Sequence, residues 1–179
     1  LPLKGLRFYP RSIYDEANRL NHEFFPGLVD RVEGKPVDEF NRLMVRSSGR
    51  DYHFTMVRDA FVQQVLKPIG LDYQEYRPVI LFINGEFWGL HNLRERLDDR
   101  YVENVYGVDA DDVDMLEITG NVVYGEGRHY LAMLQAIDAG FELGEIEARM
   151  DIDNYINYHL SQVYFDNGDW PNNNIRFWR

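Results

Sequence analysis

Apolar residues in the first half of this chain repeat at the two-residue spacing typical of β-strands. Alternation from Leu6 onward predicts a strand that Pro10 ends. A second strand is predicted over residues 40–47, before the polar break at Ser48-Gly49-Arg50-Asp51. Residues 115–118 predict a further short strand, and residues 120–127, which begin and end with glycine, predict a loop.

The clearest local signal is a β-hairpin. Two apolar runs, residues 79–83 and 87–93, flank Asn84-Gly85, the preferred pair for a two-residue turn in which both residues need positive φ. Because the first run is continuously apolar, it predicts a strand buried on both faces.

Apolar residues at helical spacing predict four helices, over residues 55–67, 99–105, 128–139 and 152–164. Asp98 or Asp99 is placed to cap the second helix, and Asp151 the last. Gly168 is expected to supply the left-handed residue after the last helix. The predicted buried faces are Phe54, Val57, Ala60, Phe61 and Val65, then Tyr130, Leu131, Leu134 and Ile137, then Ile152, Tyr155, Ile156, His159, Leu160, Val163 and Tyr164. Strands come mainly first and helices later, which indicates an α+β fold in a single domain over residues 1–179.

Composition narrows the possible function. Lys and Arg total 19 against 30 Asp and Glu, and the net charge of -11 disfavours nucleic acid as a partner. There are no cysteines, which excludes disulfides and thiolate zinc sites, and the five histidines lack metal-ligand spacing. No apolar run reaches the roughly 20 residues of a transmembrane helix.

The strongest chemical pattern follows the last predicted helix. Asp169 precedes Asn174 by five residues, the Asp-x-x-x-x-Asn spacing of a protein-kinase catalytic loop. In that loop the acid receives the proton of the substrate hydroxyl and the amide binds Mg²⁺. A structural alternative for each is a loop residue, because Asp and Asn both favour turns.

Several stretches together resemble the CotH (spore coat protein H) kinase family, with the last segment most similar to exported bacterial members. They are residues 4–9, 43–51, 56–59, 82–89 with 93–96, and 169–174. The resemblance implies an atypical protein-kinase-like fold that binds ATP and Mg²⁺ and phosphorylates serines on surface or spore-coat proteins. It implies a secreted or cell-surface location and a basic or serine-rich protein substrate.

The resemblance also assigns site residues. It makes Asp169 the catalytic acid, and Asn174, or Asn173 if the loop is offset, the metal ligand. It places Glu95 near the adenine and Lys4 on the phosphates, with Arg46 as the competing phosphate ligand. The family's upstream phosphate-covering loop and downstream metal-binding aspartate have no counterpart, so we expect the 179 residues to be a fragment.

Structural alternatives exist for the other residues. Glu95 could be a solvated partner of Arg94 or Arg96, Arg46 and Arg58 could pair with Asp51 or Asp59, and Lys4 could be an exposed strand lysine. Asp59 is the only acid on its predicted helix. His159 is expected in the core, and Trp88, Trp170 and Trp178 are expected to pack.

The sequence is compatible with three functions. The first is an ATP- and Mg²⁺-dependent protein kinase. The second is a catalytically incomplete kinase-like module that presents an acidic surface to a basic partner, which the charge of -11 favours. The third is a carbohydrate-associated surface domain, which would rest only on exposed aromatic residues.

Overall fold

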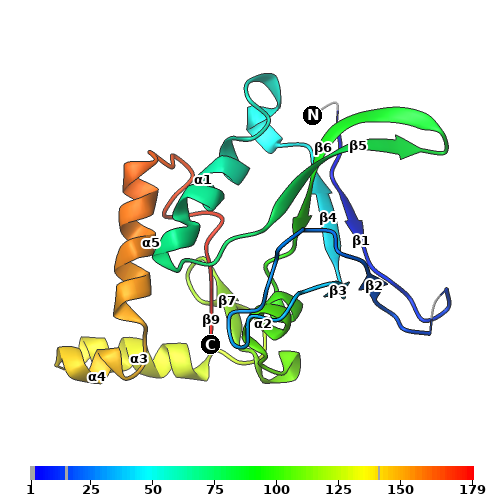
Figure 1. Cartoon of the computed structure of the whole chain (residues 1–179). Coiled ribbons are helices and arrows are strands. Elements are labelled where there is room, and N and C mark those ends of the chain that lie inside the picture. Colours follow the sequence, from blue (N-terminus) through cyan, green and yellow to red (C-terminus); the bar gives the residue numbers. More distant parts are fainter. Residues whose placement is uncertain (1–2, 15, 141) are drawn as a thin grey trace. The chain divides into compact units, whose positions relative to one another are not determined.

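Four antiparallel strands form the principal sheet of the structure, a computed structural model that describes residues 3–14, 16–140 and 142–179 (Figure 1). The strand order is β1-β4-β6-β5, and each neighbouring pair is antiparallel. Their bounds are Leu6–Phe8 for β1, Leu43–Arg46 for β4, Tyr76–Ile83 for β5 and Glu86–Glu95 for β6. The strands predicted at residues 6 and 40–47 are therefore confirmed, the second from Leu43.

The contacts between residues divide the chain into two units. One comprises the chain up to Val65 together with Asp72–Ala110, and the other comprises Leu66–Leu71 and Asp111–Arg179. The principal sheet belongs to the first unit. A short 3₁₀ helix, η2 (Lys67–Ile69), belongs to the second. Antiparallel sheets together with five α-helices in the described residues confirm the α+β class.

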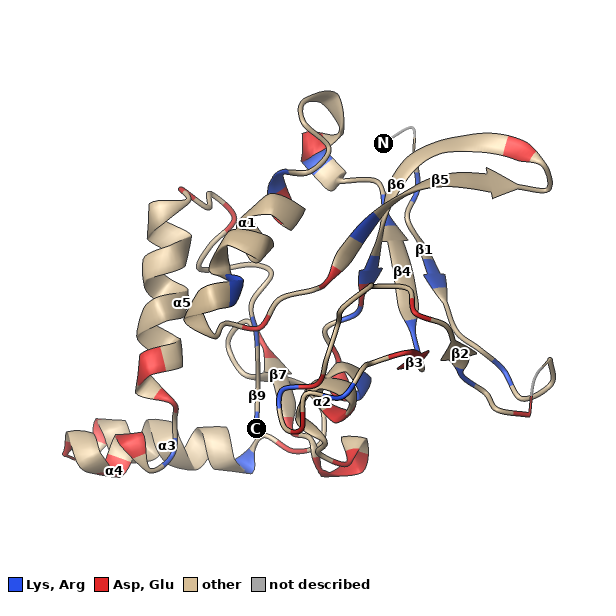
Figure 2. Cartoon of the chain, viewed as in Figure 1, with Lys and Arg blue, Asp and Glu red and all other residues tan. Residues whose placement is uncertain are grey.

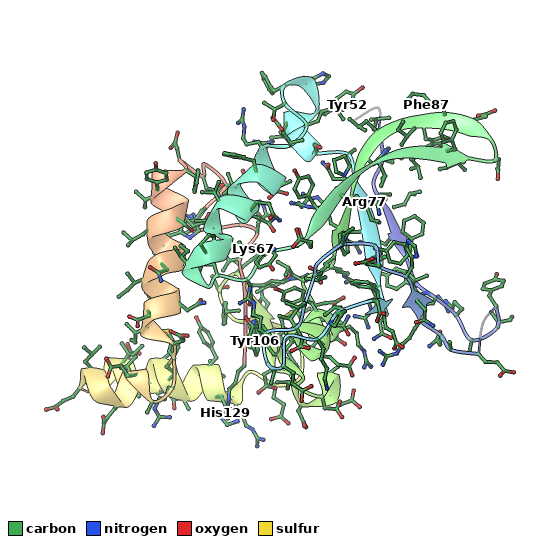
Figure 3. The ribbon with its side chains drawn as sticks, viewed as in Figure 1. Tyr52, Lys67, Arg77, Phe87, Tyr106 and His129 are labelled. Carbon is green, nitrogen blue, oxygen red and sulfur yellow. The ribbon has the colours of Figure 1, made fainter. Side chains whose placement is uncertain are left out.

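The predicted hairpin joins β5 and β6 through Asn84 and Gly85, whose φ angles are 52° and 83°. Leu81 lies opposite Gly89 and Phe82 opposite Phe87, so β6 carries one extra residue at this point, a β-bulge. The prediction that β5 is buried on both faces was wrong. Ile80 is 62% exposed and Phe82 59%, because β5 is the edge strand of this sheet and one of its faces remains open. Phe87 can be seen on the same hairpin in Figure 3.

One face of the sheet carries the main apolar core of the first unit. Buried side chains of β4 and β6 pack there with residues around a two-stranded ribbon, β2 (Leu20–Asn21) and β3 (Glu39–Phe40). The buried members are Phe25, Leu28, Val37, Phe40, Leu43, Val45 and Leu93. The opposite face of the same strands is left for the polar side chains described below.

Helix α1 (Arg58–Leu66) follows β4 after a 3₁₀ turn, η1 (Gly49–His53). It begins three residues later than predicted because Met56 has a positive φ of 63° and the Asp51 carboxylate accepts the Arg58 N–H, which sets the first turn. The predicted apolar face of this helix is mostly exposed, and only Ala60 is buried among its described residues.

Helix α2 (Asp99–Tyr106) matches its prediction at both ends. The Asp98 carboxylate accepts hydrogen bonds from the Arg100 and Tyr101 N–H groups, and Gly107 ends the helix with φ 66°. A 3₁₀ turn, η3 (Ala110–Asp112), closes the first unit and opens the second.

The second unit contains a three-stranded antiparallel sheet in the order β8-β7-β9. Strands β7 (Met115–Glu117), β8 (Asn121–Tyr124) and β9 (Arg176–Trp178) form it. The strand predicted at residues 115–118 is confirmed, but the loop predicted at 120–127 was wrong, because residues 121–124 pair with β7. The glycines at both ends of that segment are typical of a loop, but the short strand between them forms because it pairs with β7.

The described residues of this unit also form the α-helices α3 (Arg128–Asp138), α4 (Leu143–Glu147) and α5 (Ile152–Tyr164). Asp151 caps α5 as predicted, by accepting the Asn154 N–H at 2.9 Å. The predicted buried faces were wrong: Leu131 is 59% exposed and Leu160 62%, while Ala136 and Ser161 are the buried described residues of α3 and α5. Helical spacing identifies which residues share a face, but tertiary contacts decide whether that face is covered.

The end of α5 also differs from its prediction. The left-handed residue is Asp166, with φ 48°, and not Gly168. None of the helices in residues 3–14, 16–140 and 142–179 has the length and apolar character needed to cross a membrane.

Candidate functional site

Three polar side chains lie on the sheet face opposite the apolar core of the first unit. Arg46 on β4 is directly opposite Asn92 on β6, and Arg94 follows two residues later on the same strand. Because side chains alternate between faces along a strand, all three belong to one face. Figure 2 shows the Lys and Arg positions on the strands of this sheet.

Helix α1 supplies the counter-charge for the two arginines. The Asp59 carboxylate is ion-paired with Arg94 Nη1, and its Oδ2 lies 3.3 Å from Arg46 Nη1. Its other oxygen, Oδ1, accepts a hydrogen bond of 3.0 Å from Gln63 Nε2. Arg94 is 2% exposed, whereas the Arg46 and Asp59 side chains are 45% and 51% exposed. The cluster therefore has a buried base and an open rim.

The environment shifts the pKa of both ion-pair partners. Desolvation opposes ionisation of Asp59, but Arg94 and Arg46 outweigh it and hold the pKa of this carboxyl below its usual value. Burial lowers the pKa of Arg94, and Asp59 opposes that change. An arginine remains protonated at neutral pH, so two positive charges face one negative charge.

The loop between β4 and α1 is fixed by hydrogen bonds around the same hollow. Ser48, at φ 62°, donates its hydroxyl to the Met56 carbonyl. Asn92 Nδ2 donates to both Ser48 Oγ and the Met56 carbonyl, each at 2.9 Å. The hollow is lined by Arg46, Ser48, Met56, Asp59, Ala60, Asn92 and Arg94. It is thus a built feature of the first unit, made by β4, β6, α1 and their connection.

Of the sequence-predicted pairs, Arg46 with Asp59 and Arg58 with Asp51 are both present, the second with Nε and Oδ1 at 3.7 Å. The sequence did not single out Asp59 and Arg94 as members of a site. A signal was available, since Arg94 stands two residues after Asn92, on the same face of its strand, and Asp59 is the sole acid of α1.

The structure does not bring Glu95 to this cluster. Glu95 lies opposite Leu43 in the strand register, on the face that carries the apolar core, and its side chain is buried. Its carboxylate accepts the Glu75 N–H at 3.0 Å, and its carbonyl accepts Gln74 Nε2 at 2.7 Å. These contacts correct the alternative of a solvated partner for neighbouring arginines.

Lys4 lies before β1 and is exposed. Its carbonyl oxygen is 3.2 Å from His91 Nε2, which ties this segment to the buried His91 on β6. The observed contact of Lys4 is therefore through its main chain.

Asp169, Asn173 and Asn174 belong to the second unit, on the loop between α5 and β9, and all three are exposed. Asn174 has a positive φ of 58°. Asn167 fastens the start of the loop to α5 through Nδ2 and Gln162 Oε1 at 2.6 Å. Asn167 Oδ1 in turn accepts the Asp169 N–H at 3.2 Å, so the main chain at the acid is set by the end of the helix.

The indole of Trp170 anchors the residue after the acid. Its ring meets the His159 ring edge-on at 5.3 Å, and His159 Nδ1 lies 2.9 Å from the Tyr155 carbonyl. The Trp170-Pro171 peptide bond is cis. Trp170 packs as predicted, but His159 is only partly buried, so its prediction as a core residue was wrong. Helix α5 therefore positions the loop through polar and aromatic side chains.

The donor types on this loop suit magnesium. Mg²⁺ prefers oxygen ligands and is commonly held by one or two protein groups together with substrate phosphates. Asp169 and Asn174 provide a carboxylate and an amide on one exposed loop. Within the part of the chain that the structure describes, no three His, Cys, Asp or Glu side chains gather as a complete metal site. The residues fit a metal that arrives with a phosphate ligand.

Comparison with known protein families gives a match over most of the chain. A family model described as CotH kinase protein matches residues 14–179, which is most of the chain. The matched range includes Arg46, Asp59, Arg94 and the loop with Asp169. No curated protein and no solved structure matches the chain.

Proposed function

The chain belongs to the CotH kinase family, and from this premise we propose that it transfers the γ-phosphoryl group of ATP to serine hydroxyls of a protein. Family membership supports a kinase-like function. The finer assignment depends on the residues of the sheet and of the loop after α5.

The structural observation that carries the proposal is the ion pair between Arg46 and Asp59. Protein kinases pair a basic residue on a sheet strand with an acid on the following helix, and that basic residue holds the nucleotide phosphates. Here β4 is the strand, α1 is the next α-helix, and Arg46 Nη1 lies 3.3 Å from Asp59 Oδ2. Arginine in place of lysine retains the charge and adds a planar fork for phosphate oxygens.

In the proposed reaction Asp169 orients the serine hydroxyl and accepts its proton as the oxygen bonds to the γ-phosphorus and the bond to the β-phosphate oxygen breaks. Asn174, or Asn173, would hold Mg²⁺, which neutralises charge on the phosphates when it is bound. Arg46 would steady the phosphates, with Lys4 as the alternative. The placement of the adenine near Glu95 stays a prediction.

The test is transfer of labelled γ-phosphate by the full-length protein to a serine-containing protein substrate. We expect Asp169→Asn to lower the rate about a hundredfold or more, the size of a lost general base. Asp166→Asn is the matched control, since it makes the same change on an exposed residue three positions earlier. Undiminished transfer by the Asp169 variant would contradict the role given to this carboxylate.

The metal ligand is tested by two glycine substitutions on the same loop. Glycine retains the positive φ of 58° that Asn174 adopts, so Asn174→Gly removes the amide without backbone strain. We expect it to raise the Mg²⁺ concentration needed for half-maximal transfer, and Asn173→Gly to leave it unchanged. The reverse result would make Asn173 the ligand.

A non-catalytic module is the alternative, favoured by the net charge of -11, which suits a basic partner. Calorimetry with MgATP separates the two. Heat of binding by the full-length protein supports the kinase, and its absence supports the module.

A further inference from the structure

The buried arginine of β6 has unused hydrogen-bonding capacity. Arg94 is 2% exposed, and one of its nitrogens, Nη1, is paired with Asp59. Among the described residues, no acceptor lies within hydrogen-bonding distance of its Nε or Nη2, although both atoms are buried. A guanidinium presents five N–H donors in a fixed plane, so the unused side of this fork is a defined geometric feature.

Buried N–H donors that have no acceptor lower the stability of a protein, and the loss is larger where the group is charged. Asp59 does not supply the missing acceptor, because its Oδ2 is shared between Arg94 and Arg46 and its Oδ1 accepts from Gln63. An acceptor placed in the hollow would satisfy these donors.

The other lining groups favour an anion as that acceptor. The oxygens of Ser48 and Met56 are already engaged by Asn92 Nδ2. Arg46 and Arg94 together exceed the charge of Asp59 by one positive charge. Arg46, at 45% exposure, lies at the rim, and Arg94 lies at the base.

We propose that Arg94 is a phosphate ligand, whose Nε and Nη2 donate to two oxygens of one phosphate group of a nucleotide polyphosphate while Arg46 contacts the same phosphate from the rim. The planar fork of an arginine matches phosphate oxygens in bidentate geometry, and the charge-assisted bonds that result are the strong ones. The identity of the ligand as a nucleotide polyphosphate rests on the proposed function. The unsatisfied donors, in contrast, belong to the structure itself.

The test compares three probes by calorimetry on the full-length protein: magnesium pyrophosphate, MgADP and adenosine. Arg94→Lys retains the charge but loses the fork. We expect this variant to bind pyrophosphate and MgADP at least about tenfold more weakly, which is the loss of one charge-assisted hydrogen bond, and adenosine within about twofold of the original protein. Arg77→Lys, an exposed arginine of β5 labelled in Figure 3, is the matched control and should change none of the three.

Two results would overturn the inference. One is pyrophosphate binding that is undetectable in the original protein or unchanged in Arg94→Lys. The other is an equal loss of all three probes, adenosine included, which would show that Arg94 only maintains the fold. If Arg94→Lys is too unstable to assay, the double variant Asp59→Asn with Arg94→Met removes the ion pair as a unit, and we expect it to fold without binding pyrophosphate.

The proposed kinase activity and the proposed phosphate-binding role of Arg94 can be tested independently. Asp169→Asn should bind MgADP and pyrophosphate as the original protein does, because its carboxylate acts on the hydroxyl. If the protein binds polyphosphate through Arg94 but shows no transfer activity, the proposed kinase activity is contradicted and the phosphate-binding role of Arg94 is supported. If transfer is unaffected by substitution of Arg94, the kinase activity is supported and the role of Arg94 is contradicted.

Discussion

Asp59 on α1 is ion-paired with Arg94 on β6, across 35 residues of sequence, and this contact joins the helix to the sheet face opposite the apolar core. It stabilises the positive charge of a guanidinium that is 2% exposed, while half of the carboxylate side chain stays accessible to water. The pair is thus unequal, and its two members should respond differently to substitution.

We predict that Asp59→Asn lowers the free energy of unfolding by about 1–3 kcal/mol, because it leaves the Arg94 charge buried without its counter-ion. This loss is smaller than the roughly 3–5 kcal/mol typical of a fully buried pair, because solvent screens the exposed carboxylate. Arg46→Gln, which removes a largely exposed partner of the same carboxylate, should cost less than about 1 kcal/mol. Urea unfolding measures both, and equal costs would contradict the unequal roles.

The same carboxylate should make stability depend on pH in the acid range. The two arginines hold the pKa of Asp59 below its usual value, against the effect of desolvation. Its stabilising contribution is therefore complete above the unfolded pKa of about 4 and is lost as the pH falls through the lower folded pKa. The stability difference between the original protein and Asp59→Asn should be constant from about pH 5 to 8 and shrink below about pH 4. A difference that grows on acidification would show that the sign is wrong.

Local chemistry accounts for what the sequence predicted well. The Asn84-Gly85 turn and the caps at Asp98 and Gly107 each depend on residues a few positions apart, and all three are confirmed. Strand β8 was missed because residues 121–124 form a strand only through their hydrogen bonds with β7, while the glycines near both ends predict a loop. The exposed faces of α1, α3 and α5 show that periodicity predicts a helix without predicting what covers it.

The site could be predicted only in part for a related reason. The sequence identified Arg46 and noted Asp59, because both stand out within their own elements. It did not select Arg94, since burial of an arginine depends on strand register and on a helix that arrives from elsewhere. The same register places Glu95 on the other face of the sheet, and this placement cannot be predicted from the type of the residue.

Asp98 should be among the most sensitive acids of the first unit. Its side chain is fully buried, caps α2, and lies 2.9 Å from Arg42 Nη1 and 3.2 Å from Arg96 Nε. Asp98→Ala should therefore cost about 3 kcal/mol or more, since it removes both a cap and a fully buried carboxylate that is ion-paired with two partly buried arginines. Asp151→Ala removes only an exposed cap from α5 and should cost about 1 kcal/mol. Equal losses in thermal or urea unfolding would contradict the importance of burial at Asp98.

Two glycines of the second unit with left-handed backbone should differ because of their surroundings. Gly125 has φ 63°, and a Cβ there would lie 2.3 Å from Asp114 Oδ1 and 2.7 Å from the Val113 carbonyl oxygen. Asp114 Oδ1 also accepts the Glu126 N–H at 2.6 Å, so relief of the clash would break that bond. Gly140 has a similar φ of 79°, but its Cβ would meet no described heavy atom within 4 Å.

Gly140→Ala should therefore cost about 1 kcal/mol, the conformational penalty alone. Gly125→Ala should cost about 2–3 kcal/mol, because the same penalty is joined by a displaced hydrogen bond next to β7. Urea unfolding gives the loss of stability for each variant. Because the conformational penalty of a positive φ is common to both, the difference between the two losses measures the cost of the steric clash at residue 125. If the two losses were equal, Asp114 would have to move aside without cost, and the contact between its carboxylate and the Glu126 N–H would contribute little to the second unit.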